Sequence, residues 1–119
     1  MSYFYFLTAV NPAGDVDLLT NLVAYWRMDE TSGTRVDQVG TNDLTDNNTV
    51  TSTTGKLNNA AVFVAANSEY LSSVDTADLS IGSATSFTIT MWVRFQNVSG
   101  THILMAKGDS NGAAGQEYQ

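Results

Sequence analysis

The neighbouring residues Asp29 and Glu30 are the obvious candidates in this chain for a pair of catalytic carboxylates. Glycoside hydrolysis uses two carboxyl groups that flank one glycosidic bond. The pair directly follows residues 22–28, an alternating apolar stretch that is typical of a β-strand. Because neighbours on a strand point to opposite faces, Asp29 and Glu30 cannot flank the same bond. We therefore expect that the chain is not an enzyme. Part of a glycan hydrolase stays open as an alternative, which acidic residues downstream of Gln119 would revive.

Aromatic side chains offer a second kind of chemistry, the binding of sugars. A pyranose ring has an apolar face edged by hydroxyl groups, so sugar sites combine an aromatic platform with polar side chains. The candidate ligand-binding residues are Tyr25, Tyr70, Trp92, Arg94 and Tyr118. Trp92 is the most interesting, since it alternates against the apolar residues of its predicted strand, together with Arg94. The pattern itself favours the other interpretation, in which Trp92 is buried in the second layer of a sandwich.

The charge of the chain excludes several classes of partner. Twelve Asp and Glu residues against five Lys and Arg give a formal net charge of −7, without a basic cluster. Nucleic-acid binding needs several cations to displace the counterions of the phosphate backbone, so no nucleic acid is expected as a partner.

The absence of Cys and the single His, His102, leave neither a disulfide nor a multi-His metal site. No apolar run is long enough to span a bilayer, and no membrane insertion is expected.

Short apolar stretches separated by Asn, Asp, Ser, Thr and Gly predict strands and turns along the whole chain, and helix signals are weak. The clearest strand is residues 86–95, in which the odd-numbered positions from Phe87 to Phe95 are apolar. The other predicted strands are residues 22–28, 34–37, 59–64, 70–74, 102–106 and 116–119, with one or two more within residues 40–55. Strands 59–64 and 70–74 are predicted as a pair. This spacing, without βαβ alternation, predicts an all-β sandwich or barrel.

A length of 119 residues allows one domain at most. Residues 1–20 are interpreted as an N-terminal arm or extra strand, because their aromatic opening is too short to span a membrane and ends at Pro12 and Gly14. Residues 21–119 are then the domain itself.

Several segments occur in an order that resembles a known family. They include the strand with an aromatic pair, an acidic pair and a Ser-Gly turn at residues 22–34, the Gly-Lys turn and Asn-Ala pair before Phe63, and the Ser-Phe-Thr strand that contains Trp92. The order is similar to that of the front part of laminin G-like domains in the concanavalin A-like lectin/glucanase superfamily. The resemblance implies an antiparallel jelly-roll β-sandwich. It does not decide function, since this fold hosts lectins, enzymes, adhesion modules and virion surface proteins.

The resemblance also implies calcium as a cofactor. Related domains often hold Ca²⁺ with loop oxygens before the Tyr-Leu strand, and Asn67 and Glu69 are the corresponding ligands to expect here. Two alanines, Ala65 and Ala66, stand where further oxygens are usual. Asn and Asp also cap turns without any metal, so a loop without calcium is the alternative.

The family pattern continues for several strands beyond the position of Tyr118, so we expect the jelly roll to be incomplete at its C-terminus. Either the chain is a fragment, which we favour, or a partner completes its sheets by strand addition. Both interpretations predict exposed apolar faces and association with other chains.

Two Asn-X-Ser/Thr triplets, at Asn47 and Asn97, fit the N-glycosylation pattern. The pattern arises often by chance in a chain so rich in Asn, Ser and Thr, and alone it indicates little.

Together these features predict a non-catalytic recognition or adhesion module that binds carbohydrate and works outside the cell, on a cell surface or on a virion surface. Its partner is a glycan or a protein surface. The alternative is a structural or decoration protein of a virus particle or another surface assembly, in which the aromatic arm docks on a neighbouring chain.

Overall fold

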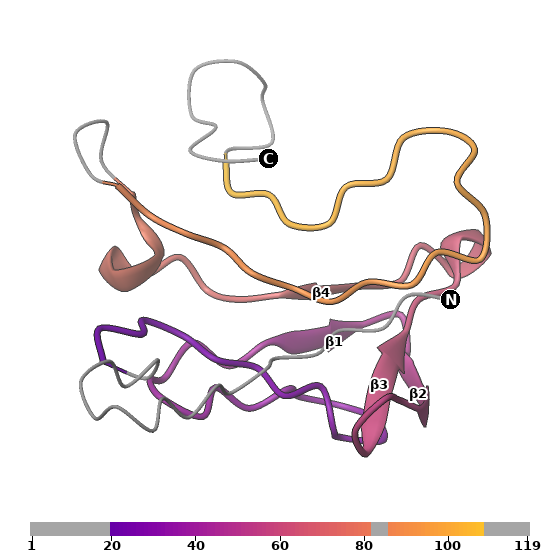
Figure 1. Ribbon diagram of the computed structural model, residues 1–119, viewed down its shortest axis with the longest axis horizontal. Coiled ribbons are helices and arrows are strands. Elements are labelled where there is room, and N and C mark those ends of the chain that lie inside the picture. The colour runs from indigo at the N-terminus through magenta and orange to yellow at the C-terminus, as the bar shows by residue number, and fades with distance from the viewer. Residues whose placement is uncertain (1–19, 82–85, 109–119) are drawn as a thin grey trace, which may run out of the picture. The chain divides into compact units, whose positions relative to one another are not determined.

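The computed structural model describes residues 20–81 and 86–108 (Figure 1). These residues divide into two compact units, the first formed by residues 20–74 and 90–96 and the second by residues 75–81, 86–89 and 97–108. Most of the predicted arm, the predicted strand 116–119 and Tyr118 lie outside the described residues.

Regular structure in the described residues consists of short strands and single turns of 3-10 helix. The strands are β1 (Thr45–Asn47), β2 (Thr51–Thr54), β3 (Asn59–Val62) and β4 (Tyr70–Ser72), and the 3-10 turns are η1 (Ala65–Asn67) and η2 (Ala77–Leu79). β1 pairs antiparallel with β4, and β2 with β3. The described part of the chain is therefore all-β with small antiparallel sheets, as the sequence predicts.

β2 and β3 form a hairpin whose residues explain its geometry. β2 is rich in Thr, a β-branched residue that favours extended backbone. The turn closes where the Gly55 N–H donates to the Asn58 carbonyl at 2.8 Å, and Asn58 takes the left-handed φ of 52° that Asn tolerates well. Ala60 and Ala61 on β3 are fully buried. Small side chains there let the hairpin lie close to the rest of its unit.

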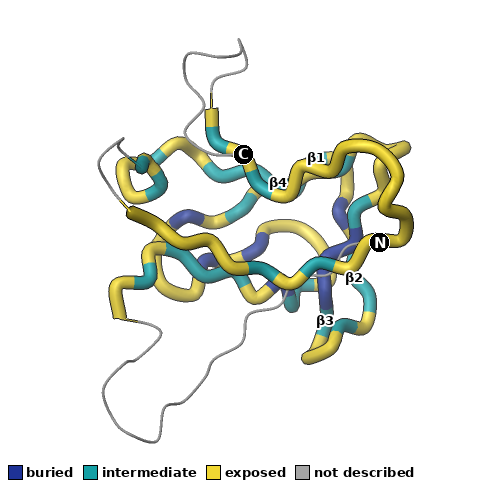
Figure 2. Tube along the Cα trace, turned by 45° about the horizontal axis from the view of Figure 1, so that its top comes forward, coloured by how far each residue is buried: buried dark blue, intermediate teal, exposed yellow. Residues whose placement is uncertain are grey.

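The apolar core of the first unit is small. Met28, Val50 and Ala61 are buried together, and four partly buried side chains pack against them: Trp26, Leu44, Phe63 and Leu71. Figure 2 shows the buried segments as short dark-blue stretches along a mostly exposed chain. The prediction that Trp26 faces a core is confirmed.

Some predicted strands are shorter or differently paired. The predicted strands 22–28 and 34–37 each contribute to single bridges, Trp26 with Asp37 and Arg35 with Leu44. Strands 59–64 and 70–74 exist in shortened form but do not pair with each other, because β3 pairs with β2 and β4 pairs with β1. The intervening residues form η1, which changes the direction of the chain between them.

The predicted strands 86–95 and 102–106 were wrong as secondary structure, since the structure assigns no strand to either segment. A strand is defined by its hydrogen-bonded neighbour, and none of the strands β1–β4 pairs with these segments. Alternation of apolar residues indicates an extended chain with two faces, but it does not supply the neighbour.

Candidate functional site

A buried carboxylate organises the loops that lead into the polar surface of the first unit. Asp37 is 5% exposed. Its Oδ1 accepts from the N–H groups of Tyr25 and Val39, both at 3.0 Å, and its Oδ2 accepts from the N–H of Asn42 at 3.1 Å and from the Asn42 side-chain amide at 3.4 Å. These bonds join three stretches of chain that have no regular sheet between them. We call this arrangement the Asp37 hub.

The electrostatics of the hub favour the charged carboxylate. Burial disfavours the charge and by itself raises the pKa of Asp37, but the N–H donors of Tyr25, Val39, Gly40 and Asn42 prevail and hold that pKa below its ordinary value. Glycine is required at position 40 because the backbone there lies close to the Asp37 carboxylate, and a Cβ would lie 2.8 Å from the Asp37 Oδ2.

A second polar arrangement joins the loop at Gly33 to the residue before β2. Arg35 is fully buried, and its guanidinium donates to the carbonyls of Gly33 and Val50. The carboxylate of Asp46 accepts from the N–H groups of the same two residues, at 3.1 Å and 2.7 Å. Arg35 and Asp46 thus hold both backbone groups of Gly33 and of Val50, an arrangement we call the Arg35–Asp46 clamp.

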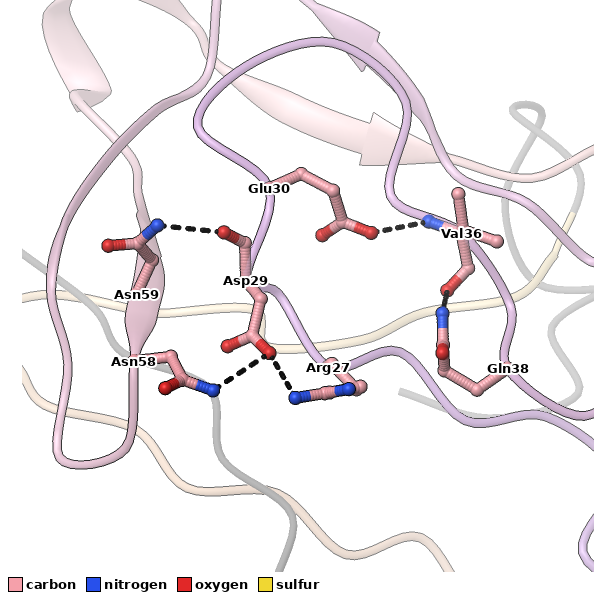
Figure 3. A network of polar contacts seen from close by, with 7 residues as sticks. All are labelled: Arg27, Asp29, Glu30, Val36, Gln38, Asn58 and Asn59. Carbon is pink, nitrogen blue, oxygen red and sulfur yellow. Dashed lines mark hydrogen bonds and ion pairs between the residues drawn. The ribbon is translucent and has the colours of Figure 1, made fainter.

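Residues 27–29 and the turn before β3 form a partly exposed polar network, drawn in Figure 3. Asp29 Oδ2 lies 2.7 Å from Arg27 Nη2 and accepts from Asn58 Nδ2 at 3.3 Å, and the Asn59 amide donates to the Asp29 carbonyl at 2.9 Å. Met28, between Arg27 and Asp29, is buried and has a left-handed φ of 60°. The network therefore presents a carboxylate that lies within hydrogen-bonding reach of both a cation and an amide.

Glu30 and Asp29 contact different partners, Glu30 the backbone of Val36 and Asp29 the side chains of Arg27 and Asn58 (Figure 3). Glu30 Oε1 accepts from the Val36 N–H at 2.9 Å, and its Oε2 is buried without a hydrogen-bond partner. The two carboxylates are thus engaged by different groups of the first unit.

The predicted ligand-binding residues differ in how far they are exposed. Trp92 is 58% exposed and Tyr70 is 54% exposed, while Tyr25 is partly buried beside the hub. Arg94 is exposed and lies two positions from Trp92. Tyr70, Trp92 and Arg94 all belong to the first unit. The structure thus leaves their side chains open to solvent, and the interpretation of Trp92 as a buried residue is wrong in this structure.

The predicted calcium ligands bind each other. Asn67 Nδ2 donates to Glu69 Oε1 at 2.8 Å, and the Val64 N–H donates to Glu69 Oε2 at 2.7 Å. These bonds close the loop that contains η1, and Ser68, the C-cap residue of η1, has a left-handed φ of 53°. Within residues 20–81 and 86–108 no group of three or more His, Asp or Glu side chains is arranged to hold a metal. None of the helices in the same part of the chain has the length and apolar character to cross a membrane.

The sequence did not point to Arg27 or Asn58 as members of a site. Asp29 and Asn58 are far apart along the chain, and only the folding of the β2–β3 hairpin beside residues 27–30 brings them together. The Asn-Asn pair after a Gly-Lys turn was the available signal, because two adjacent amides in a hairpin turn supply several donors at one place.

Comparison of the chain with known protein families, with curated proteins and with solved structures finds no match.

Proposed function

We propose that the chain is a non-catalytic recognition module that binds carbohydrate through the first unit, and that it is built on a laminin G-like jelly roll. The all-β character of the described residues and their short antiparallel sheets support the fold. The order of family-like segments, from the Trp26 strand to the segment of Trp92, supports the same proposal.

The exposed side chain of Trp92 is the observation that carries this function. A Trp that is 58% exposed offers a large apolar face that a ligand can cover. The apolar face of a pyranose fits such a surface, and Tyr70 offers a second exposed ring in the same unit. Arg94 can supply hydrogen bonds to hydroxyl groups beside Trp92.

The Arg27–Asp29–Asn58 network supplies the polar groups that a sugar site requires. Its side chains are held by mutual bonds, so little conformational entropy is lost when a ligand binds. Arg27 is paired with Asp29, and the chain carries a net charge of −7. Both features favour uncharged glycans over sulfated or uronic-acid glycans.

A glycan array probed with the full chain tests the proposal. We expect hits among neutral glycans, a loss of at least tenfold in affinity for Trp92→Ala, and retained binding for Trp26→Phe, which alters the packed tryptophan instead. The melting temperature of each variant checks that it folds. Absence of hits for the wild-type chain, or equal binding by Trp92→Ala, would refute the proposal.

A structural role in a surface assembly is the second candidate, favoured by the second unit. Phe87, Ile89, Val98, Ile103 and Leu104 are all between 40% and 82% exposed there. Apolar side chains exposed in such number are typical of surfaces that contact another protein. Light scattering over a range of concentrations should then show association that Ile103→Ser weakens, with glycan binding unchanged.

Calcium binding is tested separately, because Glu69 already accepts two hydrogen bonds. If Asn67 and Glu69 hold Ca²⁺, calorimetry should show heat on titration with Ca²⁺ that Glu69→Gln abolishes. Absence of heat, with an unchanged melting temperature, would leave Glu69 with its loop-closing role alone.

A further inference from the structure

We infer that Asn97 is an acceptor for an N-linked glycan and that Asn47 is not, although both begin an Asn-X-Ser/Thr triplet. The triplet is required because the transferase recognises the hydroxyl residue two positions after the asparagine. Two copies of the same pattern in one chain allow the structure to distinguish them. The inference is independent of the proposed sugar-binding role, since it concerns a glycan that is attached covalently.

Asn97 lies in an open turn. Asn97, Val98 and Ser99 are all exposed, and Val98 is 82% exposed. The Asn97 Oδ1 accepts from the Ser99 N–H at 2.5 Å, which folds the side chain back over its own triplet in an Asx turn. Gly100 follows with φ of 90°, and no atom lies within 4 Å of the position that a Cβ would take there. A bulky group can therefore approach the triplet.

The hydrogen bond of Asn97 also leaves its nitrogen available. The carbonyl oxygen of the side chain is the atom engaged with Ser99, whereas Nδ2 is the atom that must react. In the reaction Nδ2 attacks the anomeric carbon of an oligosaccharide carried on a lipid diphosphate. The N–C bond forms, the C–O bond to the diphosphate breaks, the lipid diphosphate leaves with the electron pair, and the amide releases one proton.

Asn47 is held in the opposite way. It is the last residue of β1, it is partly buried, and its Nδ2 donates to the Thr45 carbonyl at 3.1 Å and to the Ser72 hydroxyl at 2.9 Å. Both amide hydrogens are therefore engaged, one of them across the β1–β4 pair. Attack by this nitrogen would require both side-chain bonds to break, so the folded chain protects Asn47.

The test uses the folded full chain, made in a host that does not glycosylate it. The chain is incubated with a purified single-subunit oligosaccharyltransferase and a lipid-diphosphate oligosaccharide, and its peptides are analysed by mass spectrometry. We expect a glycan on Asn97, at least tenfold less on Asn47, complete loss at position 97 for Ser99→Ala, and no change for Asn47→Gln.

The urea-unfolded chain is the control for conformation. Unfolding removes the bonds of the Asn47 amide, so both triplets should then accept the glycan. The inference is overturned if the folded chain stays unmodified at Asn97, or if Asn47 is modified in the folded chain to the same extent.

Discussion

Replacement of Asp37 by Asn tests whether the Asp37 hub holds the first unit together. The substitution keeps the size of the side chain but turns one acceptor oxygen into an NH₂ donor. Each carboxylate oxygen of Asp37 accepts two hydrogen bonds. The NH₂ group that the substitution introduces replaces one of these oxygens, whichever way the amide is turned, so two N–H donors then face a donor instead of an acceptor. The backbone N–H of Asn42 is buried, so its loss of an acceptor cannot be fully offset by water.

The magnitude follows from the burial of each donor. An unsatisfied buried donor costs roughly 1–3 kcal/mol, and a donor that water can reach costs about 1 kcal/mol. We expect Asp37→Asn to lower the free energy of unfolding by about 2–4 kcal/mol at pH 7, which is a large share of the stability of a small domain. Urea unfolding, followed by the fluorescence of Trp26 and Trp92, measures the change. Asp78→Asn, which removes the same charge from an exposed site, should change it little.

The change of this stability difference with pH tests whether the charged form of Asp37 is the stabilising one. The pKa of Asp37 is lowered in the folded chain, so its stabilising effect is fully present above the unfolded-state value, about 3.9, and is lost as the pH falls through the folded-state pKa. The difference in stability between wild type and Asp37→Asn should therefore be constant from pH 7 to pH 5 and shrink below about pH 4. A difference that stays constant down to pH 2, or a loss below 1 kcal/mol at pH 7, would contradict the proposed role of the hub.

Four further substitutions test the first unit by the same urea unfolding. Gly40→Ala should destabilise the chain by about 1–3 kcal/mol, because its Cβ would press on Asp37 Oδ2, and a neutral result would place Gly40 outside the hub. Arg35→Met should lower the free energy of unfolding by about 3 kcal/mol, since the carbonyls of Gly33 and Val50 lose their guanidinium donors. A stabilised variant would instead show that burying the Arg35 cation costs more free energy than its hydrogen bonds return. Trp26→Ala should lower the free energy of unfolding by about 3 kcal/mol, because Trp26 packs on the core and donates to the Asn42 carbonyl at 2.7 Å. Trp92→Ala should lower it by less than about 1 kcal/mol, because Trp92 is exposed. Equal losses for the two variants would contradict this assignment.

Residue types predicted the class of structure well. Turn-forming residues between short apolar stretches predicted an all-β chain, and β3 and β4 lie within the segments predicted for them. The period of two around Trp26 also predicted correctly that this side chain packs inward. These features depend on neighbours along the chain, which a sequence displays directly.

Pairing and exposure were not predictable in the same way. The registers Thr45 with Ser72 and Thr51 with Val62 depend on which segments meet in space. The apolar alternation of residues 86–95 predicted a strand at the centre of a sheet, yet the structure assigns no strand there and leaves Phe87 and Ile89 exposed. An alternating pattern indicates which side chains share one face of an extended segment. Those side chains become buried only where another strand, helix or loop packs against that face.

The candidate site was less predictable than the fold, because it depends on bonds between side chains and distant backbone groups. Asp37 was interpreted only as the end of a short strand, although it proved to be the principal acceptor of the first unit. Asn58 meets Asp29 only through the hairpin turn. No short-range pattern specifies such contacts, since an Asp or Asn in a loop has the same appearance whether it caps its own turn or a remote one.

Polar bonds of this kind have a consequence for ligand binding. The buried apolar side chains are few and mostly small, while Arg35, Asp37 and Asn42 are buried beside them. The loops that carry Arg27, Asp29 and Asn58 are therefore held by carboxylates and a guanidinium as much as by apolar contact. A sugar bound by this network should accordingly lose affinity in parallel with the acid-induced loss of stability. Affinity and unfolding free energy measured between pH 7 and pH 3 on one preparation test this expectation, and affinity that falls while stability is unchanged would refute it.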